Sequence, residues 1–164
     1  MALEIIATAG ASDANSYVTL AEAEAIAFGY LNRATWIAAS DADKNASFVM
    51  ATRNIDSLSL AGTPIGQQGD ESSTSYQPLH FPTTDTKTYI PDDVKTATTV
   101  QAMYLIRSGE ESQAVRDIID SGVEEQDTGR FKSVYNKGWA TTVTQEAQQA
   151  LSKWKQRTVN LEFG

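Results

Sequence analysis

The sequence predicts a mainly α-helical protein: a small helical bundle with a long irregular loop and a minor β-hairpin or extended segment. Three observations predict this class. Apolar residues recur at helical spacing in several windows, helix-starting motifs precede those windows, and glycine and proline gather in one stretch between them. The 164 residues are enough for a single domain, 1–164, with a buried core.

The N-terminal third is expected to contain an arm and three helical segments. Residues 1–16 are mostly small and polar after a short apolar start, which predicts an extended arm. Thr19 begins a Thr-Leu-Ala-Glu capping box, in which two side chains satisfy backbone amides reciprocally, so we expect a helix over about 20–31. A short helical turn is expected at about 34–39, and a serine-capped helix at about 41–58.

A long loop is expected at residues 61–88, where glycine, proline, serine and threonine are abundant. Loops of this length in a compact domain are usually functional or disordered. We therefore expect this loop to lie at a subunit or partner surface. The expected loop interface consists of Gly66, Gln67, Gln68, Gly69 and Asp70.

The C-terminal half is expected to begin and end with helix. Pro91 and the two acidic residues after it begin a helix, because proline fits the first turn and acids complement the helix dipole. Gly109 is expected to end that helix, and a separate short helix is expected at about 114–121. Residues 123–135 lose the helical period, which predicts a strand or hairpin. A last helix then leads into a tail at 158–164.

The composition excludes several kinds of chemistry. The chain has no cysteine, so disulfides, thiolate catalysis and cysteine zinc sites are excluded. His80 is the only histidine, which removes histidine-rich metal sites and most Ser-His triads. No apolar run approaches the roughly 18 residues of a membrane span, and no basic segment opens a signal peptide. We expect no membrane association and a cytoplasmic place of synthesis.

The net charge of −8 makes the chain a poor general DNA binder, because attraction to phosphate dominates nucleic-acid affinity. The charge is unevenly spread, however. Only Glu146 and Glu162 are acidic after residue 128. The basic residues of that region are Arg130, Lys132, Lys137, Lys153, Lys155 and Arg157. There are two interpretations of this charge asymmetry, and both stay open. In one, it serves binding to a partner or to a second copy of the chain; in the other, the basic residues form an ordinary solvated face.

No motif supports catalysis, a metal or a cofactor. The adjacent acid pairs at 92–93, 110–111 and 124–125 cannot face one another on a helix, so they are expected to be helix-end or solvated charges. His80 lies between apolar residues, which is typical of a packed loop histidine. The Gly-Gln-Gln-Gly segment at 66–69 lacks the lysine of a phosphate-binding loop. We expect a protein that is not an enzyme.

Aromatic residues lie among lysines in the C-terminal region, and they allow two interpretations. The residues are Phe131, Tyr135, Trp139 and Trp154. In the first interpretation they form a stacking platform for single-stranded DNA. In the second, Trp154 anchors its helix to the core and the lysines are solvent-exposed.

Five blocks in a fixed order resemble one family. They are SYVTLAEA at 16–23, ASDADK at 39–44 after Trp36, ATRNID at 51–56, QPLHFP at 77–82 and IPDDVKTAT at 90–98. The pattern is similar to the head–tail connector family of tailed bacteriophages, also called neck adaptors or head-completion proteins. Some of its members carry the label DnaT-like single-stranded-DNA-binding protein. Phe81 stands where the family usually has tryptophan, and Thr83 where it usually has arginine.

The resemblance implies a structural virion protein of the neck, assembled in the host cytoplasm. A single adaptor domain of this family forms a homo-oligomeric ring beneath the portal protein, dodecameric in the virion. It extends the DNA channel and docks a neck stopper or tail-terminator protein, while double-stranded DNA passes without specific binding. The alternative is a single-stranded-DNA-binding replication accessory protein. The negative charge disfavours that alternative, and the aromatic and basic C-terminal region favours it.

Under the adaptor interpretation, the C-terminal region is the expected portal contact. Alternating apolar residues in the tail suit an added strand or an anchor in a groove, and a basic rim speeds encounter with an acidic surface. The other reading is that the tail folds back on its own helices. The expected contact residues are Trp154, Lys153, Lys155, Arg157, Val159, Leu161 and Phe163.

Overall fold

A computed structural model describes residues 3–66, 76–120, 125–127, 132–134 and 143–155. The protein is mainly α-helical in this structure, and the predicted fold class is therefore confirmed. The helices are α1 (Leu20–Ala27), α2 (Ala34–Ala38), α3 (Asp41–Asp56), α4 (Asp92–Asp120) and α5 (Gln145–Ala150), followed by the 3-10 turn η1 (Ser152–Trp154). The minor β component is an antiparallel pair, β1 (Glu125–Asp127) and β2 (Lys132–Val134), in which Gln126 lies opposite Ser133.

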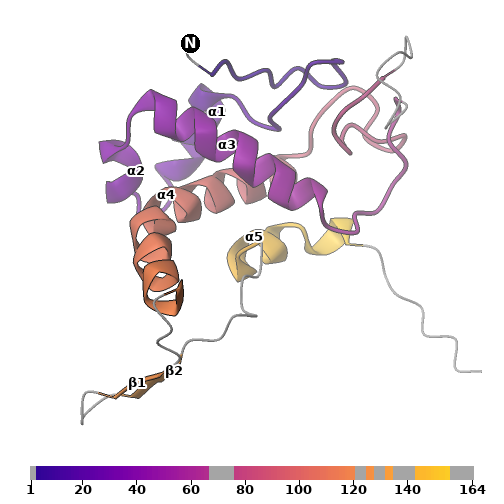
Figure 1. The fold of residues 1–164 in the computed structure, drawn as a ribbon. Helices are drawn as coiled ribbons and strands as arrows, with labels where there is room; N and C mark the ends of the chain where they lie inside the picture. Colours follow the sequence, from indigo (N-terminus) through magenta and orange to yellow (C-terminus); the bar gives the residue numbers. More distant parts are fainter. Residues whose placement is uncertain (1–2, 67–75, 121–124, 128–131, 135–142, 156–164) are drawn as a thin grey trace, which may run out of the picture.

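Helix α4 is the centre of the bundle. Helices α1, α2, α3 and α5 all contact it, and Figure 1 shows it running past α2, α3 and α5. Its first turn carries two acidic residues directly after Pro91, as predicted for a helix N-terminus. The other helices therefore depend on α4 for most of their packing surface.

Three helices begin at the side-chain caps that the sequence predicts or allows. At α1 the Glu22 backbone N–H donates to Thr19 Oγ1 at 3.3 Å, and the Thr19 N–H donates to Glu22 Oε2 at 2.9 Å. At α3 the Asp43 N–H donates to Ser40 Oγ at 3.2 Å. At α5 Thr144 Oγ1 accepts from the Ala147 N–H, also at 3.2 Å. Each cap satisfies an amide that the helix itself leaves unpaired.

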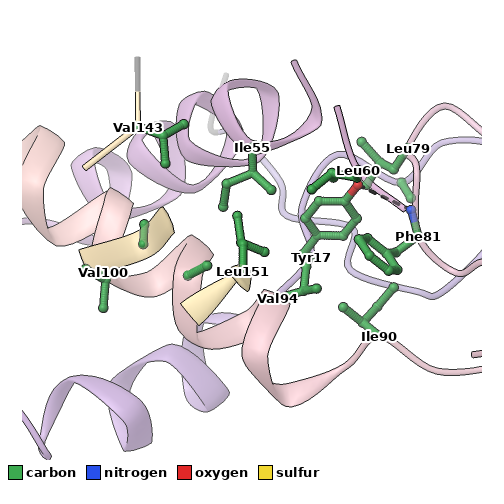
Figure 2. Packing of buried hydrophobic residues seen from close by; sticks show 13 residues of the cluster. Tyr17, Ile55, Leu60, Leu79, Phe81, Ile90, Val94, Val100, Val143 and Leu151 are labelled. Carbon is green, nitrogen blue, oxygen red and sulfur yellow. Dashed lines mark hydrogen bonds between the residues drawn. The ribbon is translucent and has the colours of Figure 1, made fainter. Parts of the chain in front are cut away.

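The core consists of two apolar clusters. The Phe48 cluster joins α1, α2, α3 and the middle of α4, and its buried members are Val18, Ala23, Ala27, Trp36, Phe48, Ala51, Ala102 and Met103. The Phe81 cluster joins α3, α4, α5 and the long loop, and Figure 2 shows it from close by. Its larger members are Tyr17, Ile55, Leu60, Leu79, Phe81, Ile90, Val94, Val100, Val143 and Leu151.

The described end of the long loop is held to the core by a buried tyrosine. The Tyr17 hydroxyl donates to the Asp56 carboxylate, and it accepts from the Phe81 backbone N–H at 3.3 Å (Figure 2). The same Asp56 oxygen accepts from the His80 N–H at 3.0 Å. The Tyr17 and Phe81 rings meet edge to face, with centroids 5.9 Å apart. Residues far apart in sequence are thereby joined at one point.

A buried glutamine organises the same loop from within. The Gln77 side-chain amide donates to the carbonyls of Leu79 at 2.7 Å and Pro82 at 3.0 Å, while its oxygen accepts from the Gly66 N–H at 3.0 Å. These contacts occupy backbone groups that a strand would need for its ladder. An isolated bridge joins Pro64 to Thr83, and residues 79–81 form no strand.

Two predicted helix ends in the C-terminal half are wrong. Gly109 does not end its helix, because α4 continues to Asp120; an exposed glycine within a helix costs only about 1 kcal/mol. The last α-helix ends at Ala150 instead of near residue 157. There the chain tightens into a 3-10 turn, and the Trp154 carbonyl accepts from the Ala61 N–H on the long loop.

Candidate nucleic-acid interface

The connection between α1 and α2 exposes apolar and aromatic side chains. Phe28 is 64% exposed and Ile37 is 56% exposed. The Arg33 guanidinium lies 5.5 Å from the centroid of the Phe28 ring. Arg33 Nη1 also donates to the carbonyls of Phe28 at 2.9 Å and Tyr30 at 3.1 Å, so the cation is held beside the ring. We call Phe28, Arg33 and Ile37 the platform.

A hollow of about 220 Å³ lies against the platform, between α1, α2 and α3. Lys44 and Glu24 line it together with the platform residues, and Lys44 Nζ lies 3.2 Å from Glu24 Oε1. Lys44 Nζ also lies 5.4 Å from the centroid of the buried Trp36 ring. Two cations and one carboxylate therefore border this face, which leaves it locally positive on an acidic chain.

A second hollow, of about 190 Å³, is lined in part by residues of the same connection. Tyr30, Asn32, Tyr104, Arg107 and Glu146 line it, and we call it the Tyr30–Tyr104 pocket. Both tyrosines are half-buried, whereas the charged groups are exposed. The Arg107 guanidinium lies 5.9 Å from the centroid of the Tyr104 ring. Burial, together with the nearby Glu146 carboxylate, raises the pKa of the Tyr30 hydroxyl.

This combination of groups suits unpaired bases better than duplex DNA. Exposed aromatic rings stack with bases, and a base in a single strand offers its whole face. Guanidinium groups beside those rings add cation–π attraction and contact phosphate. Base stacking of this kind does not itself require positive charge, whereas the net charge of −8 repels the phosphates and weakens the overall affinity.

The predicted portal-contact residues that the structure describes have partners within the chain. Trp154 is half-buried and meets Phe81 edge to face, with ring centroids 5.2 Å apart. Lys153 forms an ion pair with Asp93, and Lys155 Nζ donates to Gln148 Oε1 at 3.0 Å. Trp154 thus packs against the core, as the second interpretation of the aromatic residues expected. The remaining residues of the set, Arg157, Val159, Leu161 and Phe163, lie outside the described residues.

The predicted loop interface lies largely outside the described residues as well. Gly66 is described and donates its N–H to Gln77, but Gln67, Gln68, Gly69 and Asp70 are not described. His80 packs in the loop with Nε2 3.2 Å from the Ala61 carbonyl oxygen. Within the described ranges, no three histidine or acidic side chains gather where they would hold a metal ion. No described helix combines the length and apolarity that a bilayer crossing requires.

Neither the platform nor the Tyr30–Tyr104 pocket is predicted from the sequence. Tyr104 and Arg107 are three residues apart on α4, a spacing that places them on one helix face and was a usable signal. Tyr30 and Glu146 gave no such signal, because only tertiary packing brings the α1–α2 connection and α5 to the same side of α4.

Comparison with known proteins gives one match. Residues 1–160 match the model of a family described as "Putative DnaT-like ssDNA binding protein". No curated protein matches the chain, and no solved structure does. The part of the resemblance that concerned members with the DnaT-like label is therefore confirmed.

The same match overturns the adaptor interpretation. Nothing in the comparisons points to a head–tail connector family, and the matched description names single-stranded DNA. The expected function as a head–tail adaptor beneath a portal is thus wrong, and the alternative reading is the better supported one. The net charge was a poor guide to function, because net charge predicts attraction to phosphate and says nothing about stacking with bases.

Proposed function

This chain belongs to the family of DnaT-like single-stranded-DNA-binding proteins, and on that premise we propose that it binds single-stranded DNA without converting it chemically. The observation that carries the proposal is the platform. Phe28 is 64% exposed, and the Arg33 guanidinium is fixed 5.5 Å from its ring. An aromatic face with an adjacent cation is the arrangement that binds an unpaired base next to its phosphate.

The charges near the platform predict how the affinity depends on salt. Arg33 is the described cation of the platform, whereas Lys44 is buried and paired with Glu24. If the Arg33 guanidinium contacts one phosphate, the logarithm of the binding constant falls with the logarithm of salt concentration with a slope of about −0.7. The slope is shallow because stacking provides much of the affinity, while the acidic remainder of the chain keeps the binding weak.

Fluorescence anisotropy with a labelled oligothymidine at low salt tests the proposal. The Phe28→Ala variant is expected to bind about 5- to 150-fold more weakly, the range that corresponds to the loss of one base–aromatic stack. Tyr89→Ala is the matched control, because Tyr89 is also exposed, at 59%, but lies in the loop before α4. Its affinity is expected to equal that of the unmodified protein.

A second pair of variants separates the guanidinium from charge alone. Arg33→Gln is expected to weaken binding, whereas Lys87→Gln, an equal loss of charge in the loop before α4, leaves it unchanged. Duplex DNA of the same length is expected to compete poorly, because its bases are already stacked. The proposal is wrong if the unmodified protein does not bind at low salt, or if Phe28→Ala and Tyr89→Ala bind equally well.

A further inference from the structure

We propose that the Tyr30–Tyr104 pocket binds one guanine base of the single strand, an inference that rests on the proposed function. The pocket adjoins the platform through a shared segment. Arg33 donates to the carbonyls of both Phe28, on the platform, and Tyr30, in the pocket wall. Under this proposal, a strand stacked on Phe28 continues along the shared segment and places a neighbouring base in the pocket.

The body of the pocket suits the flat face of a base. Tyr30 and Tyr104 supply two half-buried aromatic walls, and the buried side chains of Val100 and Met103 supply an apolar floor. Sites for small ligands combine such surfaces with a few placed polar groups. The volume of about 190 Å³ lies below the range of drug-sized sites, which favours a single ring system over a larger ligand.

The rim of the pocket carries the groups that distinguish guanine. Arg107 presents a guanidinium and Glu146 presents a carboxylate, both exposed. In the described part of the chain neither forms an ion pair, so both remain available to a ligand. Glu146 lines the pocket together with Tyr30, whose hydroxyl pKa is raised by burial and by this nearby carboxylate.

Guanine is the base whose edges fit these two groups together. It presents the acceptors O6 and N7, which arginine contacts in a bidentate manner, and the donor N2, which a carboxylate accepts. Adenine places an amino donor beside N7, where a guanidinium would meet it unfavourably. In a single strand the Watson–Crick edges are free as well. Thymine presents O2 and O4 on either side of its N3–H donor and so has no two adjacent acceptors. Cytosine presents the adjacent acceptors O2 and N3 but only one amino group, whereas guanine offers a carboxylate both N1–H and N2–H.

The test compares oligothymidines that carry one central guanine, adenine, cytosine or inosine. The guanine oligomer is expected to bind about 5- to 150-fold more tightly than unsubstituted oligothymidine, the discrimination of one good bidentate contact. Inosine keeps O6 and N7 but lacks the N2 amino group, so it is expected to lose part of the gain. Adenine is expected to give none, and cytosine is expected to give less than guanine.

Variants at the rim assign the preference to this pocket. Glu146→Gln and Arg107→Gln are expected to abolish the guanine preference and to reduce affinity for oligothymidine about threefold at most. Glu4→Gln and Arg53→Gln are matched controls, because both side chains are charged and exposed at positions outside the pocket lining. Both controls are expected to retain the preference. Melting temperatures of all four variants are compared with the unmodified protein to show that the fold is intact.

The outcomes separate the two proposals. Equal affinity for all substituted oligomers, with the loss in Phe28→Ala retained, overturns the pocket assignment and leaves single-strand binding standing. A guanine preference that survives in both Glu146→Gln and Arg107→Gln also overturns it. Absence of binding to every oligomer overturns the proposed function and the guanine site together.

Discussion

Replacement of Tyr17 by phenylalanine is expected to destabilise the protein without disturbing its packing. The ring is 1% exposed and meets Phe81 edge to face, and phenylalanine keeps that contact. The variant removes only the hydroxyl, which donates to Asp56 and accepts from the Phe81 N–H. The perturbation therefore tests one polar junction between the N-terminal segment, α3 and the long loop.

The magnitude follows from what the missing hydroxyl leaves behind. The Phe81 N–H lies in a residue that is 1% exposed, and an unsatisfied buried donor costs about 1–3 kcal/mol. The Asp56 carboxylate keeps the His80 N–H as a donor and is only half-buried, so its loss is smaller. We expect the free energy of unfolding to fall by about 2–3 kcal/mol.

Urea unfolding followed by tryptophan fluorescence measures this change, because the Trp154 ring contacts Phe81 and reports on the junction. Tyr89→Phe is the control; its side chain is exposed, so its unfolding free energy is expected to change by less than about 0.5 kcal/mol. A Tyr17→Phe variant as stable as Tyr89→Phe would refute the reasoning. In that case water, and not Tyr17, satisfies the loop amide.

Three further changes test the bundle and its charges by the same urea method. Gly109→Ala is expected to stabilise α4 by about 0.5–1 kcal/mol, because a Cβ there meets no atom within 4 Å; destabilisation would show an unrecognised contact. Leu151→Ala is expected to lower the free energy of unfolding by about 2–5 kcal/mol, because it leaves a cavity in the core. Leu31 is fully exposed, so Leu31→Ala is expected to change that free energy by less than about 0.5 kcal/mol; equal effects would contradict the assignment of the core. Burial raises the pKa of Asp56 in the folded protein, so stability is expected to fall as pH rises from about 4 through that raised pKa. Asp56→Asn is expected to lack this fall, and an identical pH profile would contradict it.

Local signals in the sequence located the helix starts well. A capping box, a serine and a threonine cap each mark a helix N-terminus, because the preference for a side-chain oxygen there is a short-range effect. Helix ends were predicted less well. Gly109 looked like a stop, yet α4 continues past it, because a glycine within a helix costs only about 1 kcal/mol.

The candidate site was the part that the sequence could not predict. Phe28 and Arg33 are near neighbours in the chain, but only the backbone turn that brings the Arg33 guanidinium to two carbonyls makes them one surface. The Tyr30–Tyr104 pocket draws its lining from segments more than a hundred residues apart. The packing of the helices on α4 decides whether these segments come together, and no local sequence pattern encodes that packing.

The two core clusters differ in when a growing polypeptide can complete them. Every buried member of the Phe48 cluster has been synthesised once Met103 is in place. The Phe81 cluster also requires Val143, Ala147 and Leu151, which are made much later. Until those residues are made, the apolar faces of α3 and α4 in this cluster remain uncovered. A chain still on the ribosome therefore exposes these faces to chaperones and to other nascent chains. The segment of α5 thus completes the Phe81 cluster after the other helices have been made, beside the loop that Tyr17 holds in place.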